Sequence, residues 1–134
     1  MRVPASGRPM IQNFPATASA LVEIRRFVHR AAIGSSLDGE QADELALAVS
    51  EACSNAIRHT ETEELRLVVQ VLDGCVAVEI EDQGVFRRRL PVPEVDPGGR
   101  GILLMTAFVD EIAIEEGTAA EPGTRVRLVK CKPG

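Results

Sequence analysis

Two runs of alternating apolar residues meet at Asp73-Gly74, and this pattern constrains the fold more than any other feature of the chain. Side chains along a strand point alternately to two faces, and Asp-Gly between two such runs is typical of a tight hairpin turn. The centre of the chain is therefore predicted to be an antiparallel hairpin with one apolar face. The alternating positions are Leu65, Leu67, Val69 and Val71 before the turn, and Val76, Val78 and Ile80 after it.

Two amphipathic helices are expected before this hairpin. Apolar residues recur at helical spacing from Thr17 to Ala32, and Gly34 ends that helix. A second helix spans Asp38 to about His59, and it begins with a capping box that Gln41 completes. The apolar positions are Leu21, Ile24, Val28, Ala31 and Ala32 in the first helix, and Leu45, Val49, Ala52, Cys53 and Ala56 in the second.

The remaining segments complete an α+β pattern. They are an edge strand from Met10 to Phe14 ended by Pro15, a long loop at 84–100, a helix from Gly101 to about Phe108, a strand with Ile112 and Ile114, a turn at 117–123, and a strand with Val126 and Leu128. Because helices and strands do not alternate strictly, we expect a two-layer α+β sandwich. Its sheet would be mostly antiparallel and mixed, with about three helices on one face. Residues 1–9 are expected to be a flexible tail, and residues 10–134 a single domain.

Composition disfavours several classes of partner. Lys and Arg number 15 against 20 Asp and Glu, and the net charge of −5 argues against nucleic acid or an anionic membrane as the main partner. The chain has no Trp, no Tyr and only four Phe, so it lacks the aromatic residues on which single-stranded nucleic acid stacks. The longest apolar stretch, Ile102 to Val109, is far shorter than the roughly 20 residues of a membrane span. We expect a cytoplasmic protein without direct nucleic-acid or membrane binding.

The three cysteines, Cys53, Cys75 and Cys131, are odd in number and show no CxxC or metal-ligand spacing. We therefore expect neither a disulfide framework nor a structural zinc site. Such cysteines fit a reducing cytosol, where they serve as small core residues.

Candidate chemistry begins in the second helix. Glu51, Asn55 and His59 are four residues apart, so they form one stripe on the border of the apolar face. Ala48 and Ala52 beside them are small and would leave room. A carboxylate and an amide placed there could act as a general base and a Mg²⁺ ligand. The alternative is the ordinary polar flank of an amphipathic helix.

Polar residues also fall on the apolar face of the predicted sheet. Asp82 has the parity of Val78 and Ile80, so its carboxylate points toward the core, where an unpaired charge is costly. We expect it to accept a hydrogen bond, either from an adenine amino group with bound water or from the turn that follows. Thr124 has the parity of Val126 and joins the same face, although threonine is also an ordinary strand residue.

A glycine-rich turn, Gly98-Gly99-Arg100-Gly101, opens the third expected helix. Free backbone N–H groups and the positive end of the helix dipole bind phosphate well, and Arg100 adds charge. The alternative for a single glycine cluster is a plain loop.

These segments, taken in order, resemble the nucleotide-binding boxes of the GHKL superfamily. Glu51-Ala-Cys-Ser-Asn55 resembles its N box, Asp82-Gln-Gly84 its first glycine box, Gly99-Arg-Gly101 its second, and Gly123-Thr124 its closing Gly-Thr. Residues 48–59 and 101–112 look more closely like the bacterial anti-sigma-factor serine kinases of the sporulation and general-stress type. The resemblance covers about residues 10–130.

The resemblance implies a histidine-kinase-like ATPase (Bergerat) fold with ATP and Mg²⁺ as cofactors. Glu51 would be the general base or would position water, and Asn55 would hold Mg²⁺ between the phosphates. Asp82 would take the adenine amino group, beside Gly84 at the base and with support from Thr124 through water. The remaining nucleotide-binding residues would be His59, Gly99, Arg100, Gly101 and Ile102, with residues 85–99 as a lid.

The same resemblance implies an anti-sigma regulatory factor. It would be a protein serine/threonine kinase that phosphorylates a serine of an anti-sigma-factor antagonist and sequesters a sigma factor by partner switching. A homodimer is also implied, and the edge strand from Met10 offers a surface for it. One departure is Phe86, which stands where the family usually carries a second glycine, and another is a short lid. The alternative is therefore a non-catalytic nucleotide-binding module that acts by protein–protein binding only.

Overall fold

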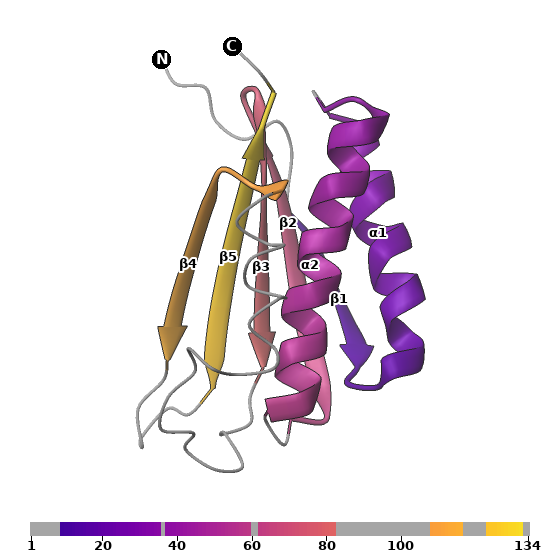
Figure 1. Ribbon diagram of the computed structural model, residues 1–134, viewed down its shortest axis with the longest axis vertical. Helices are drawn as coiled ribbons and strands as arrows, with labels where there is room; N and C mark the ends of the chain where they lie inside the picture. Colours follow the sequence, from indigo (N-terminus) through magenta and orange to yellow (C-terminus); the bar gives the residue numbers. More distant parts are fainter. Residues whose placement is uncertain (1–8, 36, 60–61, 83–107, 117–122, 133–134) are drawn as a thin grey trace.

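The computed structural model describes residues 9–35, 37–59, 62–82, 108–116 and 123–132. Its elements form two layers, in which the helices cover one face of a five-stranded sheet (Figure 1). In chain order they are β1 (Met10–Pro15), the short 3₁₀ helix η1 (Ala18–Ala20), α1 (Leu21–Ile33), α2 (Gly39–His59), β2 (Glu64–Leu72), β3 (Cys75–Asp82), β4 (Glu111–Glu116) and β5 (Thr124–Cys131). The predicted two-layer α+β architecture is confirmed.

The sheet has the strand order β1-β2-β3-β5-β4, with β1 at one edge, as predicted. All four pairings among the described strands are antiparallel, so the prediction of a mostly antiparallel sheet is confirmed. The predicted hairpin joins β2 to β3, with Leu72 opposite Cys75 in the register. Gly74 adopts a φ of +80°, a left-handed conformation that glycine reaches without the steric penalty of a side chain.

The two described helices follow local signals in the sequence. The backbone N–H of Gln41 donates to Asp38 Oδ1 at 2.8 Å, and the N–H of Asp38 donates to Gln41 Oε1 at 3.1 Å. The predicted capping box is therefore present where α2 begins. α1 ends at Ile33, directly before Gly34 as predicted, although its first turn is the separate 3₁₀ helix η1. The described part of the chain has these two α-helices rather than about three. The third expected helix, the tail at 1–8 and the loop at 84–100 lie outside it.

The core lies between the helices and the inner face of the sheet. The apolar faces of α1 and α2 meet the alternating residues of β2 and β3, and the rings of Phe14 and Phe27 pack edge to face with centroids 5.6 Å apart. Large side chains that are essentially inaccessible to solvent include Ile24, Val28, Leu45, Val49, Leu65, Leu67, Val69, Val76, Val78 and Leu128. Within the described ranges, neither helix is long and apolar enough to cross a bilayer.

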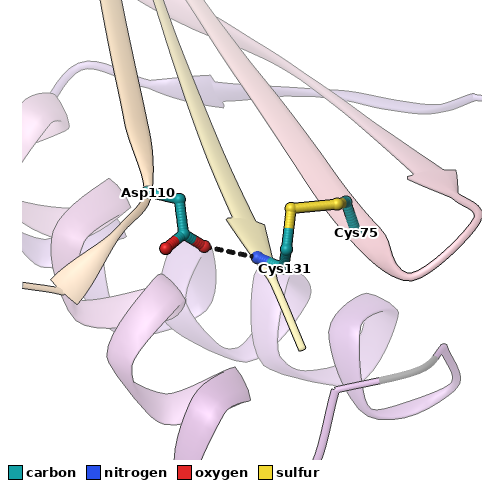
Figure 2. Close-up of a disulfide and its surroundings, with 3 residues drawn as sticks. All are labelled: Cys75, Asp110 and Cys131. Carbon is teal, nitrogen blue, oxygen red and sulfur yellow. Dashed lines mark hydrogen bonds between the residues drawn. A yellow bond between two sulfur atoms is a disulfide. The ribbon is translucent and has the colours of Figure 1, made fainter. Parts of the chain in front are cut away.

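The expectation about cysteines is wrong for two of the three. Cys75 and Cys131 form a disulfide (Figure 2), whereas Cys53 is a buried free thiol, as expected. The two bonded residues are 56 positions apart and become neighbours only because β3 pairs with β5, where they are register partners. Spacing along the sequence carries no sign of this pairing.

Candidate functional site

The residues singled out in the sequence gather at one end of the molecule. The C-terminal end of α2, the end of β3 and the start of β5 lie at the same edge (Figure 1). Glu51 and Asn55 belong to the C-terminal half of α2, Asp82 is the last residue of β3, and Thr124 is the first of β5. Four predicted site residues therefore lie on three elements whose ends share this end of the molecule, and Asp82 and Thr124 are register partners.

Asp82 is the most buried charged side chain among the described residues, with 7% of its surface exposed. In the sheet it lies between Leu65 of β2 and Thr124 of β5, its partners in the register. Its inward direction follows from the strand parity read in the sequence. Burying a carboxylate among apolar neighbours is unfavourable unless donors satisfy its oxygens, so this position suits a group that presents hydrogen-bond donors.

Glu51 and Asn55 are both half-buried on one flank of α2. Asn55 Oδ1 accepts a hydrogen bond from Arg58 Nη2 at 2.6 Å, while no hydrogen bond or ion pair within the described ranges involves the Glu51 carboxylate. Ala48 and Ala52, which were expected to leave room beside this stripe, are buried with 0% and 4% exposure. They pack in the core beneath α2 and leave no space beside Glu51 on that side. The Glu51 side chain is therefore accessible only from its solvent-facing side.

One contact at this helix was missed by the sequence reasoning. Ser50, only 4% exposed, accepts a hydrogen bond from Arg25 Nη1 of α1 at 3.1 Å. This hydrogen bond joins α1 to α2 one residue before Glu51. The available signal was Ser50 itself, a polar residue beside the apolar positions Val49 and Cys53.

The other predicted residues are not part of the described structure. They are the side chain of His59 and the residues Gly84, Phe86, Gly99, Arg100, Gly101 and Ile102. In the described residues, no group of three or more His, Cys, Asp or Glu side chains could hold a metal ion. Among the described residues, the Asn55 amide could contribute one ligand to a Mg²⁺ ion, which usually keeps several waters and also binds substrate phosphates.

A second surface feature lies between α1 and α2. It is a groove of about 590 Å³ lined by Arg25, Arg26, Arg30, His29, Asp43, Val22, Ala46 and Leu47. His29 Nε2 lies 3.0 Å from Asp43 Oδ1, and Arg26 pairs with Glu23 at 3.3 Å. The Arg30 side chain has no hydrogen-bond or ion-pair partner among the described residues. In a chain of net charge −5, this groove is locally basic.

Comparisons with known proteins agree with this arrangement. A family profile described as a histidine kinase-like ATPase domain matches residues 14–130. The anti-sigma F factor of Clostridium botulinum (strain Eklund 17B / Type B) is 31% identical over 104 residues, which cover 68% of this chain and 71% of that protein. The anti-sigma F factor of Bacillus subtilis (strain 168) is also 31% identical over 104 residues, covering 68% and 70%.

Solved structures agree at the level of the fold. The RsbU and RsbW domains of Rv1364c from Mycobacterium tuberculosis match with a TM-score of 0.67 and 21% identity, over 93% of this chain and 32% of that one. The histidine kinase AdeS of Acinetobacter baumannii matches with a TM-score of 0.51 and 13% identity, over 93% of this chain and 68% of that one.

Proposed function

This chain belongs to the histidine kinase-like ATPase domain family, and from that premise we propose that it is an anti-sigma regulatory factor with ATP-dependent protein serine kinase activity. It would phosphorylate a serine of an anti-sigma-factor antagonist and sequester a sigma factor by partner switching in the cytoplasm. Two anti-sigma F factors that share 31% identity with this chain support the regulatory part of the proposal. The catalytic part depends on the chemistry of the residues at the site edge.

The observation that carries the proposal is the buried carboxylate of Asp82 beside Thr124, at the edge that also receives the end of α2. The adenine amino group can donate a hydrogen bond to this carboxylate, and Thr124 can hold a bridging water. Bound MgATP would supply the phosphoryl group and neutralise charge on it. The Asp82 carboxylate suits the adenine ring and the Asn55 amide suits the metal ion, so the groups at this end of the sheet fit MgATP.

Asn55 and Glu51, one helical turn apart, would have two different roles, in which Asn55 binds the metal ion and Glu51 accepts a proton. Asn55 Oδ1 already accepts from Arg58, but an amide oxygen has a second lone pair, so it can also face Mg²⁺. Glu51 has no competing partner in the described part of the chain, which leaves its carboxylate available to accept a proton. We propose that Glu51 takes the proton of the attacking serine hydroxyl, which is a general-base role.

Two surfaces support the proposed protein partners. The basic groove between α1 and α2 presents Arg25, Arg26 and Arg30 beside apolar side chains, which suits an acidic segment of a partner protein. Along the side of the sheet formed by β1, Met10 and Ile11 are 40% and 53% exposed, and β1 pairs only with β2 among the described strands. We propose this edge as the contact of a homodimer, because an unpaired strand edge can continue a sheet into a second copy.

Transfer of phosphate from ATP to a purified anti-sigma-factor antagonist is the direct test. The Asn55→Ala variant should lose both Mg²⁺-dependent ATP binding and transfer. The Glu51→Ala variant should keep ATP binding and lose transfer by at least 100-fold, since a base contributes mainly in the transition state. Glu40→Ala, an exposed carboxylate at the other end of α2, is the matched control and should transfer phosphate at the parent rate.

A different result would support the alternative function. The residue Phe86, at a position where glycine is expected, favours a module that binds nucleotide and partners without catalysis. If the parent protein transfers no phosphate to the antagonist and still binds it or a sigma factor, the kinase proposal is wrong. The non-catalytic binding module then takes its place.

A further inference from the structure

The disulfide lies at the end of the sheet opposite to the candidate site. Cys75 is the first residue of β3 and Cys131 the last of β5, whereas Asp82 and Thr124 pair at the other end of the same two strands. Neither cysteine takes part in the proposed phosphoryl transfer. The proposed kinase activity therefore does not explain the presence of the disulfide.

Cys131 holds the start of β4 through its backbone. Its N–H donates to Oδ2 of Asp110 at 2.7 Å, as Figure 2 shows. The N–H of Asp110 in turn donates to the carbonyl oxygen of Val129 at 2.8 Å. Because the disulfide fixes Cys131 against β3, it also fixes the strand end on which Asp110 rests.

The neighbouring residue, Lys130, extends these contacts to the helical layer. Its Nζ donates to the carbonyl oxygen of Phe108 at 2.8 Å and lies 2.8 Å from Glu44 Oε1 of α2. The Lys130 side chain is only 13% exposed, so this ion pair is partly shielded from water. We call the set formed by Cys75, Cys131, Asp110, Lys130 and Glu44 the brace, since it joins β3, β5, α2 and the start of β4.

The chemistry of the bond suits reversible exchange. Both cysteine residues are half-buried rather than fully buried, so we expect a small thiol to reduce the bond without unfolding the domain. Disulfides that form in a reducing cytosol are mostly transient or redox-sensing, whereas structural ones belong to oxidising compartments. The cytoplasmic location is taken from the proposed function, and the inference rests on it in this respect.

We propose that Cys75–Cys131 is a thiol–disulfide switch that closes the brace when oxidised and opens it when reduced. One thiolate of a dithiol reductant attacks a sulfur of the bond and forms a mixed disulfide, and its second thiolate displaces the remaining cysteine. Cys75 and Cys131 leave as thiols after taking up two protons, while the reductant becomes a disulfide. Oxidised glutathione drives the two-electron reverse reaction.

Opening the brace changes the local stability of this end of the molecule. Without the covalent link, the last residues of β5 are held by backbone pairing, by the hydrogen bond to Asp110 and by Lys130, and strand ends that are held only by non-covalent contacts fray. The amides of Asp110 and Cys131 then lose protection together, because each depends on the position of the other. No hydrogen bond among the described residues joins Ile24 or Val28 of α1 to the brace. The amides of these core residues should therefore keep their protection from exchange.

Amide hydrogen exchange of the full chain with dithiothreitol, and then with oxidised glutathione, tests the switch. Reduction should speed exchange at residues 110–112 and 129–132 by at least 10-fold and leave α1 unchanged, and reoxidation should restore the slow rates. The Cys75→Ser/Cys131→Ser double variant should exchange at the reduced rate without reductant and give no response. The Cys53→Ala variant, which removes only the buried free thiol, should respond like the parent protein.

Three outcomes would overturn the switch. The first is that all three cysteines react with an alkylating reagent in protein isolated without reductant. The second is that millimolar dithiothreitol breaks the disulfide only when denaturant is present. The third is that reduction leaves the amide exchange rates unchanged. These measurements use neither nucleotide nor partner protein, so failure of the switch leaves the kinase proposal standing. Absence of ATP binding, in turn, would leave the switch standing.

Discussion

At the scale of single residues, two buried groups have opposite chemical characters. Asp82 is a carboxylate at the open edge of the core, with 7% of its surface exposed. Cys53 is a thiol inside the core, between Glu51 and Asn55 in the sequence of α2, with 0% of its surface exposed. The Asp82 carboxylate can interact with a ligand because it lies at the end of the sheet. The Cys53 thiol stays protonated because it is fully buried.

Replacing Asp82 by asparagine should weaken adenine-nucleotide binding and leave the fold intact. The amide is nearly isosteric but places an N–H₂ donor where the adenine amino group needs an acceptor, and a hydrogen bond to a charged group contributes about 1.5–3 kcal/mol. We expect the Kd for MgATP to rise roughly 10- to 100-fold by calorimetry. Glu79→Gln on the outer face of the same strand is the control and should bind as the parent does. Equal affinity of Asp82→Asn and parent would make Asp82 purely structural.

The buried thiol of Cys53 should make stability fall at high pH. Burial raises its pKa from 9.0 to about 12, so the folded state keeps the proton over a range in which the unfolded chain loses it. Its contribution is complete below pH 9 and is lost as pH rises toward 12, by about 1.4 kcal/mol for each pH unit. Urea unfolding at pH 8 and pH 10 should show a loss about 1.4 kcal/mol larger in the parent than in Cys53→Ala. Parallel losses would contradict the assigned pKa.

At the scale of elements, local signals determine where each helix and strand begins and ends. The side chains of Asp38 and Gln41 accept hydrogen bonds from backbone N–H groups at the start of α2, which have no acceptor within the helix. Gly74 supplies the positive φ of the hairpin between β2 and β3. Both devices act over three residues or fewer, which is why the sequence alone predicts them.

Removing the cap should destabilise the domain through α2 alone. Asp38→Ala deletes the side-chain acceptor for the Gln41 N–H, and such substitutions cost about 1 kcal/mol. The control is Glu40→Gln in the same first turn, which changes only an exposed charge near the helix N-terminus and should cost about 0.3 kcal/mol. Urea denaturation at pH 7 measures both. If the two variants lose equal stability, the hydrogen bonds of the capping box contribute nothing beyond charge.

Contacts between elements mark the limit of what the sequence predicts. Periodicity indicated which face of each element is apolar, and the inward position of Asp82 followed from it. The disulfide joins residues 56 positions apart, and the bond between Arg25 and Ser50 joins residues 25 apart. Both depend on the strand order and on the rotation of α1 against α2, which no local pattern specifies. The same dependence explains why the sequence did not predict the strand order β1-β2-β3-β5-β4.

At the scale of the whole molecule, β3 and β5 connect two regions with separate tasks. The candidate site lies at one end of these strands and the brace at the other. The eight residues of β3 place Cys75 and Asp82 roughly 23 Å apart at about 3.3 Å per residue. Groups so far apart, without shared partners, usually contribute independently to stability.

Nucleotide and disulfide should therefore stabilise the protein additively. The 56-residue separation of the cysteines predicts a contribution of about 4 kcal/mol from the restricted unfolded chain, and MgATP at 100 times its Kd adds about 2.7 kcal/mol. Urea unfolding of oxidised and reduced protein, each with and without MgATP, gives the four corners of a cycle. We expect the MgATP increment to agree within about 0.5 kcal/mol in both redox states. An increment seen only in the oxidised protein would mean that the brace controls the nucleotide site, and an increment in neither state would contradict nucleotide binding itself.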